Sequence, residues 1–352
     1  MILENKLWIF FIYTLIISLF SHRFFVIRSE KYQIKKVNVS AERWSSQSKP
    51  VLGGITFYAI FIFSIINYII FFGYENLLQG PIFGTFLVIT ISFLMGLADD
   101  MLNTPPGFKF MIQFLSAAIL IFSGIYIQTF ESQFLNYVIT TFWIVGMMNS
   151  LNMLDNMDAI TTSVSCTVLI GAIVVLGTLT GSSSVFLLIC IGALASLLSF
   201  LYYNWNPSKM YMGDNGSQFL GALLAIIGIE VFWNTPAVSN YAFIYPLVIA
   251  VSVFIVPIAD TATVTINRLL RGQSPFIGGR DHTTHHLSYF GLKDSHVALI
   301  LLSINAIFIA IISYAILSKK EISNFLIVSG ILAFLVFILL YSITKISKPK
   351  QS

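Results

Sequence analysis

The chain has 352 residues, of which 57% are hydrophobic and only 10% are charged, and its formal net charge is +4. Soluble globular domains carry about 25% charged residues, so this composition excludes a soluble domain and predicts an integral membrane protein. We interpret the small positive charge as a signal of membrane topology, and we expect no nucleic-acid partner.

Long uncharged apolar runs follow one another along almost the whole chain. Each reaches or approaches the roughly 20 residues that a helix needs to cross about 30 Å of hydrocarbon. The runs are continuous and do not alternate between apolar and polar residues, which favours helices over a β-barrel. The predicted fold is an all-α polytopic membrane protein, a single domain of residues 1–352 with about eleven transmembrane helices. In chain order these helices are predicted near residues 7–27, 55–73, 81–97, 111–129, 136–151, 161–180, 185–203, 217–233, 241–259, 296–317 and 322–343.

The distribution of Lys and Arg over the predicted loops sets the orientation. Lys6, Lys319 and Lys320 fall on one side, and the others of the 19 Lys and Arg residues fall on the opposite side. Cytoplasmic loops are enriched in these residues. We therefore expect a multi-pass protein of the cell (inner) membrane with its N-terminus outside, its C-terminus inside and its active-site loops on the cytoplasmic face.

Two further features concern the predicted helices themselves. The first apolar run lacks a small-residue cleavage site and is expected to be a retained helix. Cys166 and Cys190 both lie within predicted helices, where packing is the expected role of a cysteine.

Two adjacent carboxylates end the third predicted helix, in the stretch GLADDMLNTPPGFKF. Asp99 and Asp100 lie where a charged side chain is costly unless it pairs, binds a metal or meets water. One interpretation is that they are interfacial acids paired with Lys109 across the loop. The other is that two like charges side by side are relieved by a bound cation or by a substrate proton.

Amide and carboxylate side chains crowd the inner end of the fifth predicted helix. Asn149, Asn152, Asp155, Asn156 and Asp158 fall within ten residues, and the three asparagines share one face if the segment is helical. Their oxygens suit a hard divalent cation such as Mg²⁺, or the edge of a nucleobase and the hydroxyls of a sugar. Helix capping would use only one or two of these residues. The stretch therefore predicts a binding loop.

A glycine-rich turn opens the eighth predicted helix. In MGDNGSQFLG the glycines let the backbone approach a phosphate, and the helix N-terminus presents N–H groups to an anion. Asp214 in this turn would suit a metal that bridges to the phosphate. A Gly-Asp turn that only caps a helix is the alternative. A further loop adds Lys49 and the pair Gly53 and Gly54 to the same predicted side.

Three of the five histidines fall in the stretch RGQSPFIGGRDHTTHHLSYFGL. His282, His285 and His286 have spacings of three and four residues, which would cluster them on one face of a helical turn. Three histidines are one way to form a zinc site. However, Arg280 and further arginines nearby repel a metal and attract phosphates, so an anion-binding loop is the favoured interpretation.

Four of these stretches occur in the order found in the polyprenyl-phosphate N-acetylhexosamine-1-phosphate transferases, a branch of glycosyltransferase family 4. The chain resembles this family over nearly its whole length. The motifs that carry the resemblance are GLADD, NSLNMLDNMD, MGDNGSQFLG and DTATVTINRLLRGQSPFIGGRDHTTHHL. The ten or eleven spans of the family are in keeping with the predicted helices.

The resemblance implies a reaction. A polyprenyl phosphate, such as undecaprenyl phosphate, attacks the β-phosphate of a UDP-N-acetylhexosamine in the presence of Mg²⁺, with Mn²⁺ as an alternative ion. The products are a polyprenyl-diphosphate-sugar and UMP. The implied partners are therefore the sugar nucleotide, the lipid phosphate and the membrane lipid, and the sequence leaves open whether the protein forms a homodimer.

The resemblance also implies roles for residues. Asp99 and Asp100 match paired aspartates that bind or deprotonate the lipid phosphate, and Asn152 and Asp214 match metal ligands. The matches to substrate-binding residues are Asp155 and Asp158 in the nucleotide and sugar loop, and Lys109, Arg280, His282, His285 and His286 at the phosphates. From the residues alone, Lys49 and Asn149 join this substrate-binding set.

The chain departs from the family pattern in two places. Asp155-Asn156-Met157-Asp158-Ala159 stands where the family has Asp-Gly-x-Asp-Gly, so two glycines are lost along with some backbone freedom. The histidine loop is one residue longer, with Thr283 and Thr284 ahead of the histidine pair.

Two alternative functions stay open at this point. The branch that uses UDP-N-acetylmuramoyl-pentapeptide shares the aspartate and histidine motifs. Its Pro-Thr-Met-Gly-Gly stretch is missing where this chain has residues 49–54, so a plain N-acetylhexosamine donor, with N-acetylglucosamine foremost, is favoured. A secondary transporter of ions or sugar nucleotides would carry its acids near the bilayer midplane, whereas here they sit at helix ends.

Overall fold

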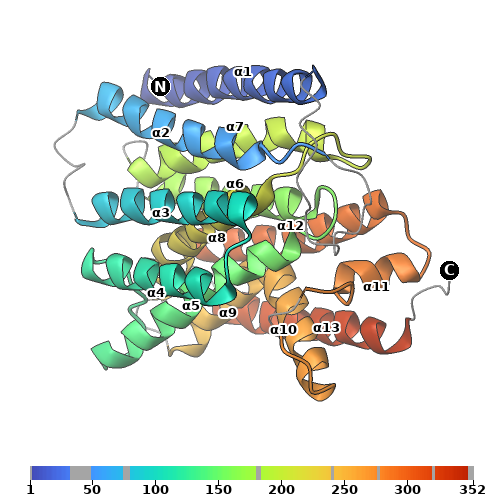
Figure 1. The fold of residues 1–352 in the computed structure, drawn as a ribbon. Coiled ribbons are helices and arrows are strands. Elements are labelled where there is room, and N and C mark those ends of the chain that lie inside the picture. Colours follow the sequence, from blue (N-terminus) through green and yellow to red (C-terminus); the bar gives the residue numbers. More distant parts are fainter. Residues whose placement is uncertain are drawn as a thin grey trace.

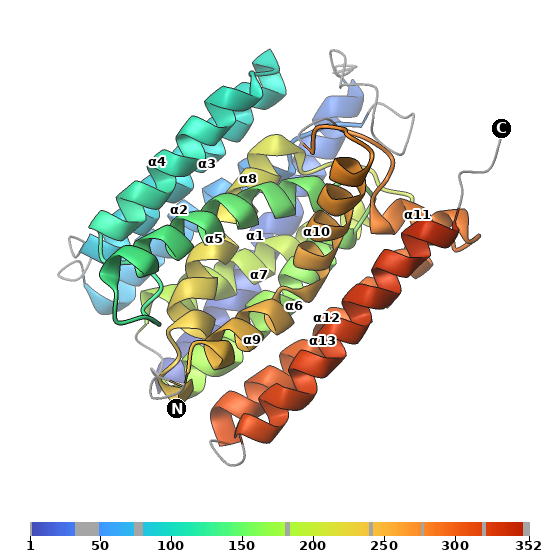
Figure 2. The same ribbon diagram turned by 90° about the horizontal axis from the view of Figure 1, so that it is seen from below.

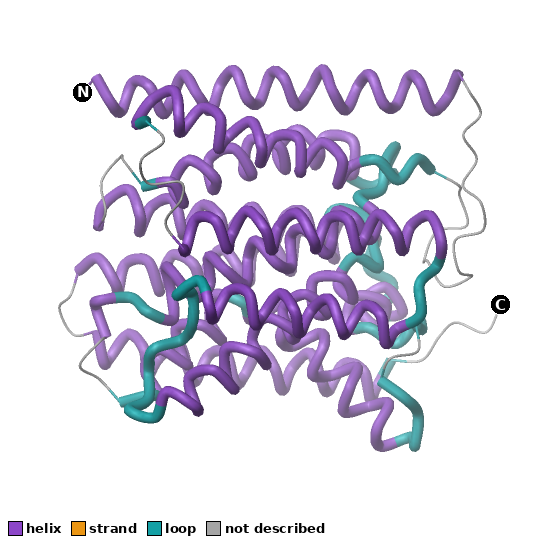
Figure 3. Tube along the Cα trace, turned by 60° about the vertical axis from the view of Figure 1, so that its left-hand side comes forward, coloured by secondary structure: helices purple, strands orange, loops and turns teal. Residues whose placement is uncertain are grey.

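The computed structural model describes residues 2–31, 49–73, 80–179, 184–238, 242–275, 278–318 and 322–347. Within these ranges all regular elements are helices, and extended pairing is limited to an isolated bridge between Val51 and Tyr211 (Figure 3). The helices are α1 (Ile2–Lys31), α2 (Gly53–Phe72), α3 (Gly80–Leu102), α4 (Pro106–Phe122), α5 (Gln133–Leu154), α6 (Ile160–Leu179), α7 (Val185–Asn204), α8 (Gly213–Ile227), η1 (Gly228–Trp233), η2 (Pro236–Val238), α9 (Ile244–Val253), α10 (Ile255–Leu270), α11 (Thr283–Tyr289), α12 (Asp294–Ser318) and α13 (Ile322–Ile346).

The predicted all-α membrane fold is confirmed, but the predicted count of eleven spans is not. In the described part of the chain, nine helices are long and apolar enough to cross a membrane, or ten if α9 and α10 form one bent span. Each predicted segment coincides with helix, so the difference lies in α4 and in the α9–α10 pair. The orientation relative to the membrane stays a prediction.

Helix α4 is shorter than the predicted segment 111–129. It ends at Phe122, and Gly124 follows in the left-handed region with a φ of 88°. The N–H of Gly124 bonds to the carbonyl of Ile121, and the N–H of Ile125 bonds to that of Leu120. This pattern is the Schellman motif, which satisfies the last carbonyls of a helix and turns the chain away.

A bend of 90° separates α9 from α10 within the predicted segment 241–259. Pro257 lies in the first turn of α10. A proline has no N–H to donate, and its ring collides with the carbonyl four residues earlier, which here belongs to Val253 at the end of α9. Phe254 therefore takes a non-helical conformation, and the chain changes direction there.

Helix α8 occupies the interior of the bundle and packs most extensively against α3 and α5 (Figure 1). Glycines permit this close approach. A Cβ at Gly96 of α3 would lie 2.3 Å from the carbonyl oxygen of Asp214, and a Cβ at Gly221 of α8 would lie 2.6 Å from the Cα of Met148 on α5. The helices that carry most of the predicted polar residues are therefore held in direct backbone contact.

The outer helices frame this core. Figure 2 shows α12 and α13 along one side of the bundle, and α3 and α4 along the opposite side. Helix α1 begins at one end of the bundle and α13 ends at the other (Figure 1). The end of α13 meets the short helix α11, because His286 Nδ1 lies 2.6 Å from the hydroxyl of Ser347.

Candidate active site

Three charged side chains from three helices meet at the end of α3. The Nζ of Lys109, near the start of α4, lies 2.5 Å from Asp99 Oδ2 and 3.1 Å from Asp214 Oδ2. Asp99 belongs to the last turn of α3, and Asp214 belongs to the first turn of α8. We call Asp99, Lys109 and Asp214 the carboxylate cluster. Two carboxylates share one ammonium group here, so the cluster has a surplus of negative charge that favours a further cation.

The loop after α3 fixes Asp99 in this cluster. Asp99 Oδ1 accepts hydrogen bonds from the backbone N–H of Thr104 at 2.9 Å and from the Thr104 hydroxyl at 2.6 Å. The side chain of Asp99 is 8% exposed, whereas those of Lys109 and Asp214 are 24% and 25% exposed. A ligand can therefore reach the cluster on the side of Lys109 and Asp214.

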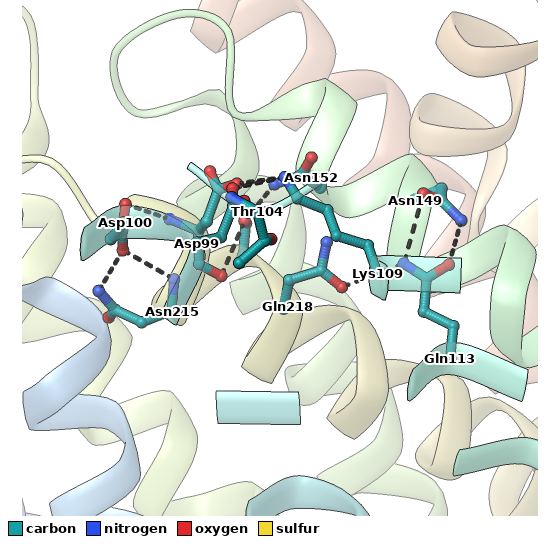
Figure 4. A network of polar contacts seen from close by, with 11 residues as sticks. Asp99, Asp100, Thr104, Lys109, Gln113, Asn149, Asn152, Asn215 and Gln218 are labelled. Carbon is teal, nitrogen blue, oxygen red and sulfur yellow. Dashed lines mark hydrogen bonds and ion pairs between the residues drawn. The ribbon is translucent and has the colours of Figure 1, made fainter. Parts of the chain in front are cut away.

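Asp100 binds the N-terminus of α8. Its Oδ1 accepts a hydrogen bond from the N–H of Asp214 at 3.1 Å, and its Oδ2 accepts from the N–H and the side-chain amide of Asn215 at 3.0 and 2.5 Å (Figure 4). A carboxylate is stabilised in this position by the free N–H groups and the helix dipole. The N–H groups that the sequence assigned to a substrate phosphate thus bind Asp100, which the sequence predicted to be catalytic.

A layer of amide side chains lies one helical turn from the carboxylate cluster. Gln113 follows Lys109 by four residues on α4, and Gln218 follows Asp214 by four residues on α8. The Nε2 of Gln113 donates to Asn149 Oδ1 and to Gln218 Oε1, both at 3.3 Å, and Asn149 Nδ2 donates to Gln113 Oε1 at 2.7 Å (Figure 4). Hydrogen bonds of this kind between helices hold α4, α5 and α8 in register.

Asn152 supplies an amide from α5 beside the start of α8. Its Nδ2 donates to the hydroxyl of Ser217 at 2.8 Å (Figure 4). Because the amide nitrogen is used in this contact, Oδ1 is the atom that Asn152 offers to a ligand.

The oxygens around the carboxylate cluster form a donor set that fits Mg²⁺. This ion prefers oxygen ligands and is usually held by one or two carboxylates, by water and by substrate phosphates. Asp99, Asp214 and Asn152 offer two carboxylates and one amide. Among the residues that the structure describes, no group of three or more His, Cys, Asp or Glu side chains could hold a metal. An ion at the cluster would therefore complete its coordination with water and substrate.

Lys49 and Asp158 lie in a second network, which joins three loops. Asp158 accepts hydrogen bonds from the Ser208 hydroxyl at 2.7 Å, from the Ser208 N–H at 3.1 Å and from Asn206 Nδ2 at 3.1 Å. Lys49 Nζ donates to the same hydroxyl at 3.0 Å and lies 5.1 Å from the ring centroid of Tyr211. Both residues thus hold the loop between α7 and α8.

The glycine-poor loop after α5 keeps one glycine-like conformation. Asp155 directly follows α5 as its C-cap. Ala159 has a φ of 66°, in the left-handed region, at the position where the resembling family has its second glycine. This conformation costs a residue with a Cβ about 1 to 2 kcal/mol. The Ala159 N–H donates to Asn204 Oδ1 at 3.0 Å, which offsets part of that strain.

Two histidines of the predicted cluster, His282 and His285, lie against each other at the start of the short helix α11, whereas His286 contacts Ser347. His282 is the residue before the helix, and its ring lies edge-on to that of His285, with centroids 5.4 Å apart. Burial, followed by the charge of His282, lowers the pKa of His285 to about 3. Burial also lowers the pKa of His286. His285 is therefore neutral at physiological pH, which differs from a loop of protonated histidines.

The positive charge of this region comes from arginines. Arg268 and Arg271 contact the carboxylate of Asp281, with closest distances of 2.6 and 2.5 Å. Burial raises the pKa of Asp281, but the two guanidinium groups outweigh it and hold the pKa at about 2. Arg280 is exposed, and its carbonyl accepts a hydrogen bond from the hydroxyl of Tyr289 at 3.0 Å.

Hydrogen bonds connect the histidine region to the loop after α5 and to α10. The hydroxyl of Thr284 donates to Asn156 Oδ1 at 2.7 Å. Asp260, on α10, contacts His282 and Thr283 at 2.6 to 2.8 Å. Thr283 and Thr284 thus bind the protein itself, and they tie the histidine region to α10 and to the loop after α5. We call the carboxylate cluster, the amide layer and the histidine region together the polar assembly.

An apolar groove of about 430 Å³ runs between α5 and α10. Its lining is almost entirely apolar, and it includes Ser150, the neighbour of Asn149 in the amide layer. The lining residues are Phe142, Trp143, Gly146, Met147, Ser150, Ile258, Thr261, Ala262, Thr265 and Ile266. The groove therefore runs along α5, the helix that also carries Asn149 and Asn152.

Sequence reasoning missed four residues that build this site, namely Thr104, Gln113, Gln218 and Asp260. Asp260 carried a usable signal, because an acidic residue inside an apolar span is costly and marks a functional position. Gln113 and Gln218 follow Lys109 and Asp214 at helical spacing, which was also readable. Thr104 lies in an irregular loop, and its contact with Asp99 depends on the path of that loop.

Residues 82–232 match the model of Glycosyl transferase family 4. The chain is 30% identical over 234 residues to a Bacillus subtilis protein described as a probable undecaprenyl-phosphate N-acetylglucosaminyl 1-phosphate transferase; the match covers 64% of this chain and 62% of that protein. Proteins named phospho-N-acetylmuramoyl-pentapeptide-transferase are similar as well. That of Staphylococcus epidermidis is 33% identical, over 51% of this chain and 61% of its own length. That of Streptococcus agalactiae is 29% identical, over 57% and 66%.

The matched part spans just under two thirds of the length of each of these relatives. The carboxylate cluster and the amide layer lie inside residues 82–232, whereas the histidine region lies after them. The resemblance that the motifs indicated is confirmed by this match, in which residues 82–232 are similar to Glycosyl transferase family 4.

Proposed function

We propose that this chain transfers a sugar 1-phosphate from a UDP-sugar to undecaprenyl phosphate, which yields undecaprenyl-diphosphate-sugar and UMP and initiates the synthesis of a cell-envelope glycan. The observation that carries the proposal is the carboxylate cluster, where Lys109 is shared between Asp99 and Asp214. An apolar groove runs between α5 and α10 of the same bundle. A diphosphate, a divalent cation and a lipid chain can meet at such a place. The name of the Bacillus subtilis relative supports N-acetylglucosamine 1-phosphate as the group transferred.

The chemistry is a phosphoryl transfer between two phosphates. An oxygen of the lipid phosphate forms a bond to the β-phosphorus of the UDP-sugar, and the bond from that phosphorus to the bridging oxygen breaks, which releases UMP. Bound Mg²⁺, held by Asp214 and Asn152, would supply positive charge that stabilises the diphosphate and the leaving UMP. The second pKa of a phosphate ester is about 6, so the lipid phosphate is mostly ionised and needs positioning more than a strong base.

The residues of the cluster divide this work. Lys109 binds a phosphate oxygen, because its ammonium group is fixed between two carboxylates and is partly exposed. Asp99 holds that ammonium group in place and is itself held by Thr104. Asp100 acts through the α8 N-terminus, where it keeps the turn that carries Asp214 in position.

The histidine region and the groove complete the substrate site. In this proposal exposed Arg280 supplies positive charge to the donor phosphates, and the imidazole N–H groups of the histidines donate hydrogen bonds to them. The groove between α5 and α10 suits the isoprenoid chain, because its lining is almost entirely apolar.

The deciding experiment is release of UMP from UDP-N-acetylglucosamine by the purified chain in detergent, with and without undecaprenyl phosphate and with and without Mg²⁺. We expect release only when lipid and Mg²⁺ are both present, with Mn²⁺ as a partial substitute. Because detergent abolishes both compartments and any membrane potential, such release excludes a transporter as the explanation. Release without lipid would indicate a hydrolase, and no release from any UDP-sugar would contradict the proposal.

A second donor is favoured by the relatives named phospho-N-acetylmuramoyl-pentapeptide-transferase. The same assay with UDP-N-acetylmuramoyl-pentapeptide compares the two directly. We expect kcat/KM for UDP-N-acetylglucosamine to exceed that for the pentapeptide donor by at least about tenfold, a difference that a few pocket contacts supply. The reverse order would assign the chain to the pentapeptide branch.

We also propose that this chain lies in the inner membrane of the cell and that its active site faces the cytoplasm. Both cysteines are buried, so a single introduced cysteine can be labelled with little background. Exposed Lys293 lies between α11 and α12, and exposed Glu131 lies between α4 and α5, at opposite ends of the predicted topology. In spheroplasts, an impermeant maleimide should label Glu131→Cys at once and Lys293→Cys only after permeabilisation. The reverse pattern would invert the orientation.

A further inference from the structure

Asp260 is a buried carboxylate on α10 that the proposed reaction does not use directly. Its side chain is 1% exposed. Both oxygens have partners: Oδ1 accepts hydrogen bonds from the Thr283 N–H at 2.8 Å and from the Thr283 hydroxyl at 2.6 Å, and Oδ2 lies 2.8 Å from His282 Nδ1. A buried charge is very costly unless it is paired and hydrogen-bonded in this way.

These contacts determine which nitrogen of His282 carries the hydrogen. An ionised carboxylate has no hydrogen to donate, and Oδ2 can therefore only accept from His282. The hydrogen between them must sit on Nδ1, which leaves Nε2 as the ring atom that faces other partners. A histidine in the opposite tautomer would bring two lone pairs together at 2.8 Å, which is repulsive.

The same carboxylate also fixes the start of α11. His282 precedes this helix, and Thr283 is its first residue, so Asp260 binds an N–H at the helix N-terminus. The residues that follow Asp260 on α10, Thr261 and Ala262, line the apolar groove between α5 and α10. One side chain thus ties the histidine region to the helix that forms a wall of the groove.

We propose that Asp260 is a positioning residue for the transfer reaction. It holds His282 with hydrogen on Nδ1 and with Nε2 directed to substrate phosphate, and it keeps the histidine region in register with the groove that binds the lipid chain. This inference rests on the proposed function, since the reaction supplies the phosphate that His282 meets.

A double-mutant cycle tests whether Asp260 acts through His282. Asp260→Asn keeps the size of the side chain but removes its charge and one acceptor oxygen. We expect kcat for UMP release to fall roughly 10- to 100-fold, as for other carboxylates that orient a functional histidine, with KM for the UDP-sugar changed less than about threefold. In a His282→Ala background the same change should have almost no further effect. An undiminished loss in that background would mean that Asp260 acts on folding, and would overturn the proposal.

Thr283→Val is the matched control. It removes the hydroxyl contact with Asp260 but keeps the Thr283 N–H and the contact with His282. We expect its activity to stay within about threefold of wild type, because Asp260 keeps its contacts with the Thr283 N–H and with His282. A loss as large as that of Asp260→Asn would overturn the assignment to the histidine.

A measurement that needs no activity separates this inference from the proposed function. In protein labelled with ¹⁵N-histidine, the His282 signals, assigned by their loss in His282→Ala, report which ring nitrogen is protonated. We expect hydrogen on Nδ1 in wild type, and a shift toward Nε2 in Asp260→Asn if that variant folds. Hydrogen on Nε2 in wild type would refute the inference. Hydrogen on Nδ1 in a protein that releases no UMP would refute the proposed function and leave the positioning contact intact.

Discussion

The carboxylate cluster and the histidine region belong to one polar assembly, but they balance their charges in opposite ways. In the carboxylate cluster, Asp99 and Asp214 share the single ammonium group of Lys109. In the histidine region, the carboxylate of Asp281 lies against two guanidinium groups. The first region is short of positive charge and suits a cation brought by the substrate. In the second region, side chains of the protein itself already neutralise the carboxylate.

This difference predicts that substitutions in the carboxylate cluster lower the rate of the reaction, whereas substitutions in the histidine region also lower the stability of the protein. In the free protein the two carboxylates of the cluster repel each other, so removing one charge removes a repulsion that opposes folding. Charges already paired stabilise the fold, and removing one leaves its partner buried and unsatisfied. Four predictions test this contrast.

Replacing Asp214 should have the largest effect. Asp214→Asn removes a proposed Mg²⁺ ligand, and we expect kcat for UMP release to fall roughly 100- to 1,000-fold, with a normal elution profile in detergent. Asp294→Asn is the control, because Asp294 begins α12 and accepts a hydrogen bond from Ser288 away from the cluster. Activity near wild type in Asp214→Asn would remove this residue from the site.

The adjacent aspartates should separate activity from stability. Asp99→Asn should lower kcat about 100-fold while leaving the melting temperature unchanged or higher, because it relieves repulsion with Asp214. Asp100→Asn should lower the free energy of unfolding by about 1 to 2 kcal/mol, because it weakens a charged cap on α8, and should reduce activity less. Thermal unfolding and UMP release measured on both variants decide this. An inactive but fully stable Asp100→Asn would place Asp100 at the substrate.

Acid should destabilise the histidine region. The pKa of His285 is lowered from 6.5 to about 3 in the folded protein, so the unfolded chain binds a proton more readily below pH 6.5. Stability from this residue is therefore complete above pH 6.5 and is lost as the pH falls from 6.5 toward 3, at up to about 1.4 kcal/mol per pH unit. The fall in melting temperature between about pH 7.5 and about pH 5 should be smaller in His285→Asn. Equal falls in both proteins would show that His285 does not set the acid response.

Substitutions at the threonines of the longer loop should have the smallest effect on activity. Thr284→Val removes the hydrogen bond to Asn156, and we expect the free energy of unfolding to drop by about 1 kcal/mol with activity within about threefold of wild type. His285→Ala and His286→Ala should each lose more activity than this. Thr178→Val is the control, since exposed Thr178 bonds only within α6. Equal losses at Thr284 and the histidines would mean that the loop acts through folding alone.

The sequence predicted the helical fold and the residues of the site more successfully than it predicted their individual contacts. The apolar runs marked the helices because a backbone in lipid must satisfy its own hydrogen bonds. The bend at Phe254 was also readable, since Pro257 cannot continue a helix through Val253. The count of spans was less secure, because α4 has 17 residues and is shorter than the roughly 20 that a helix needs to cross a membrane.

Individual roles depended on geometry that no spacing reveals. Asp99 and Asp100 are neighbours in sequence, yet one contacts Lys109 and the other binds the N-terminus of α8, because successive helical residues point about 100° apart. Lys49 and Asp158 were predicted to bind substrate, and the structure shows them bonded to Ser208. Asp260 is the first residue of the DTATV motif, but its role follows from its contact with His282, which only the structure shows.

By itself the sequence determined that this protein folds in a membrane, which segments are helical and which polar residues lie at the helix ends. These properties follow from the hydropathy and charge of the individual residues. Tertiary structure alone decided which carboxylates share the ammonium group of Lys109, which carboxylate caps a helix and which one orients a histidine. Those choices depend on distances of 2.5 to 3.1 Å between side chains up to 115 positions apart. Such distances are fixed only when α3, α4, α8 and α10 have taken their places in the bundle.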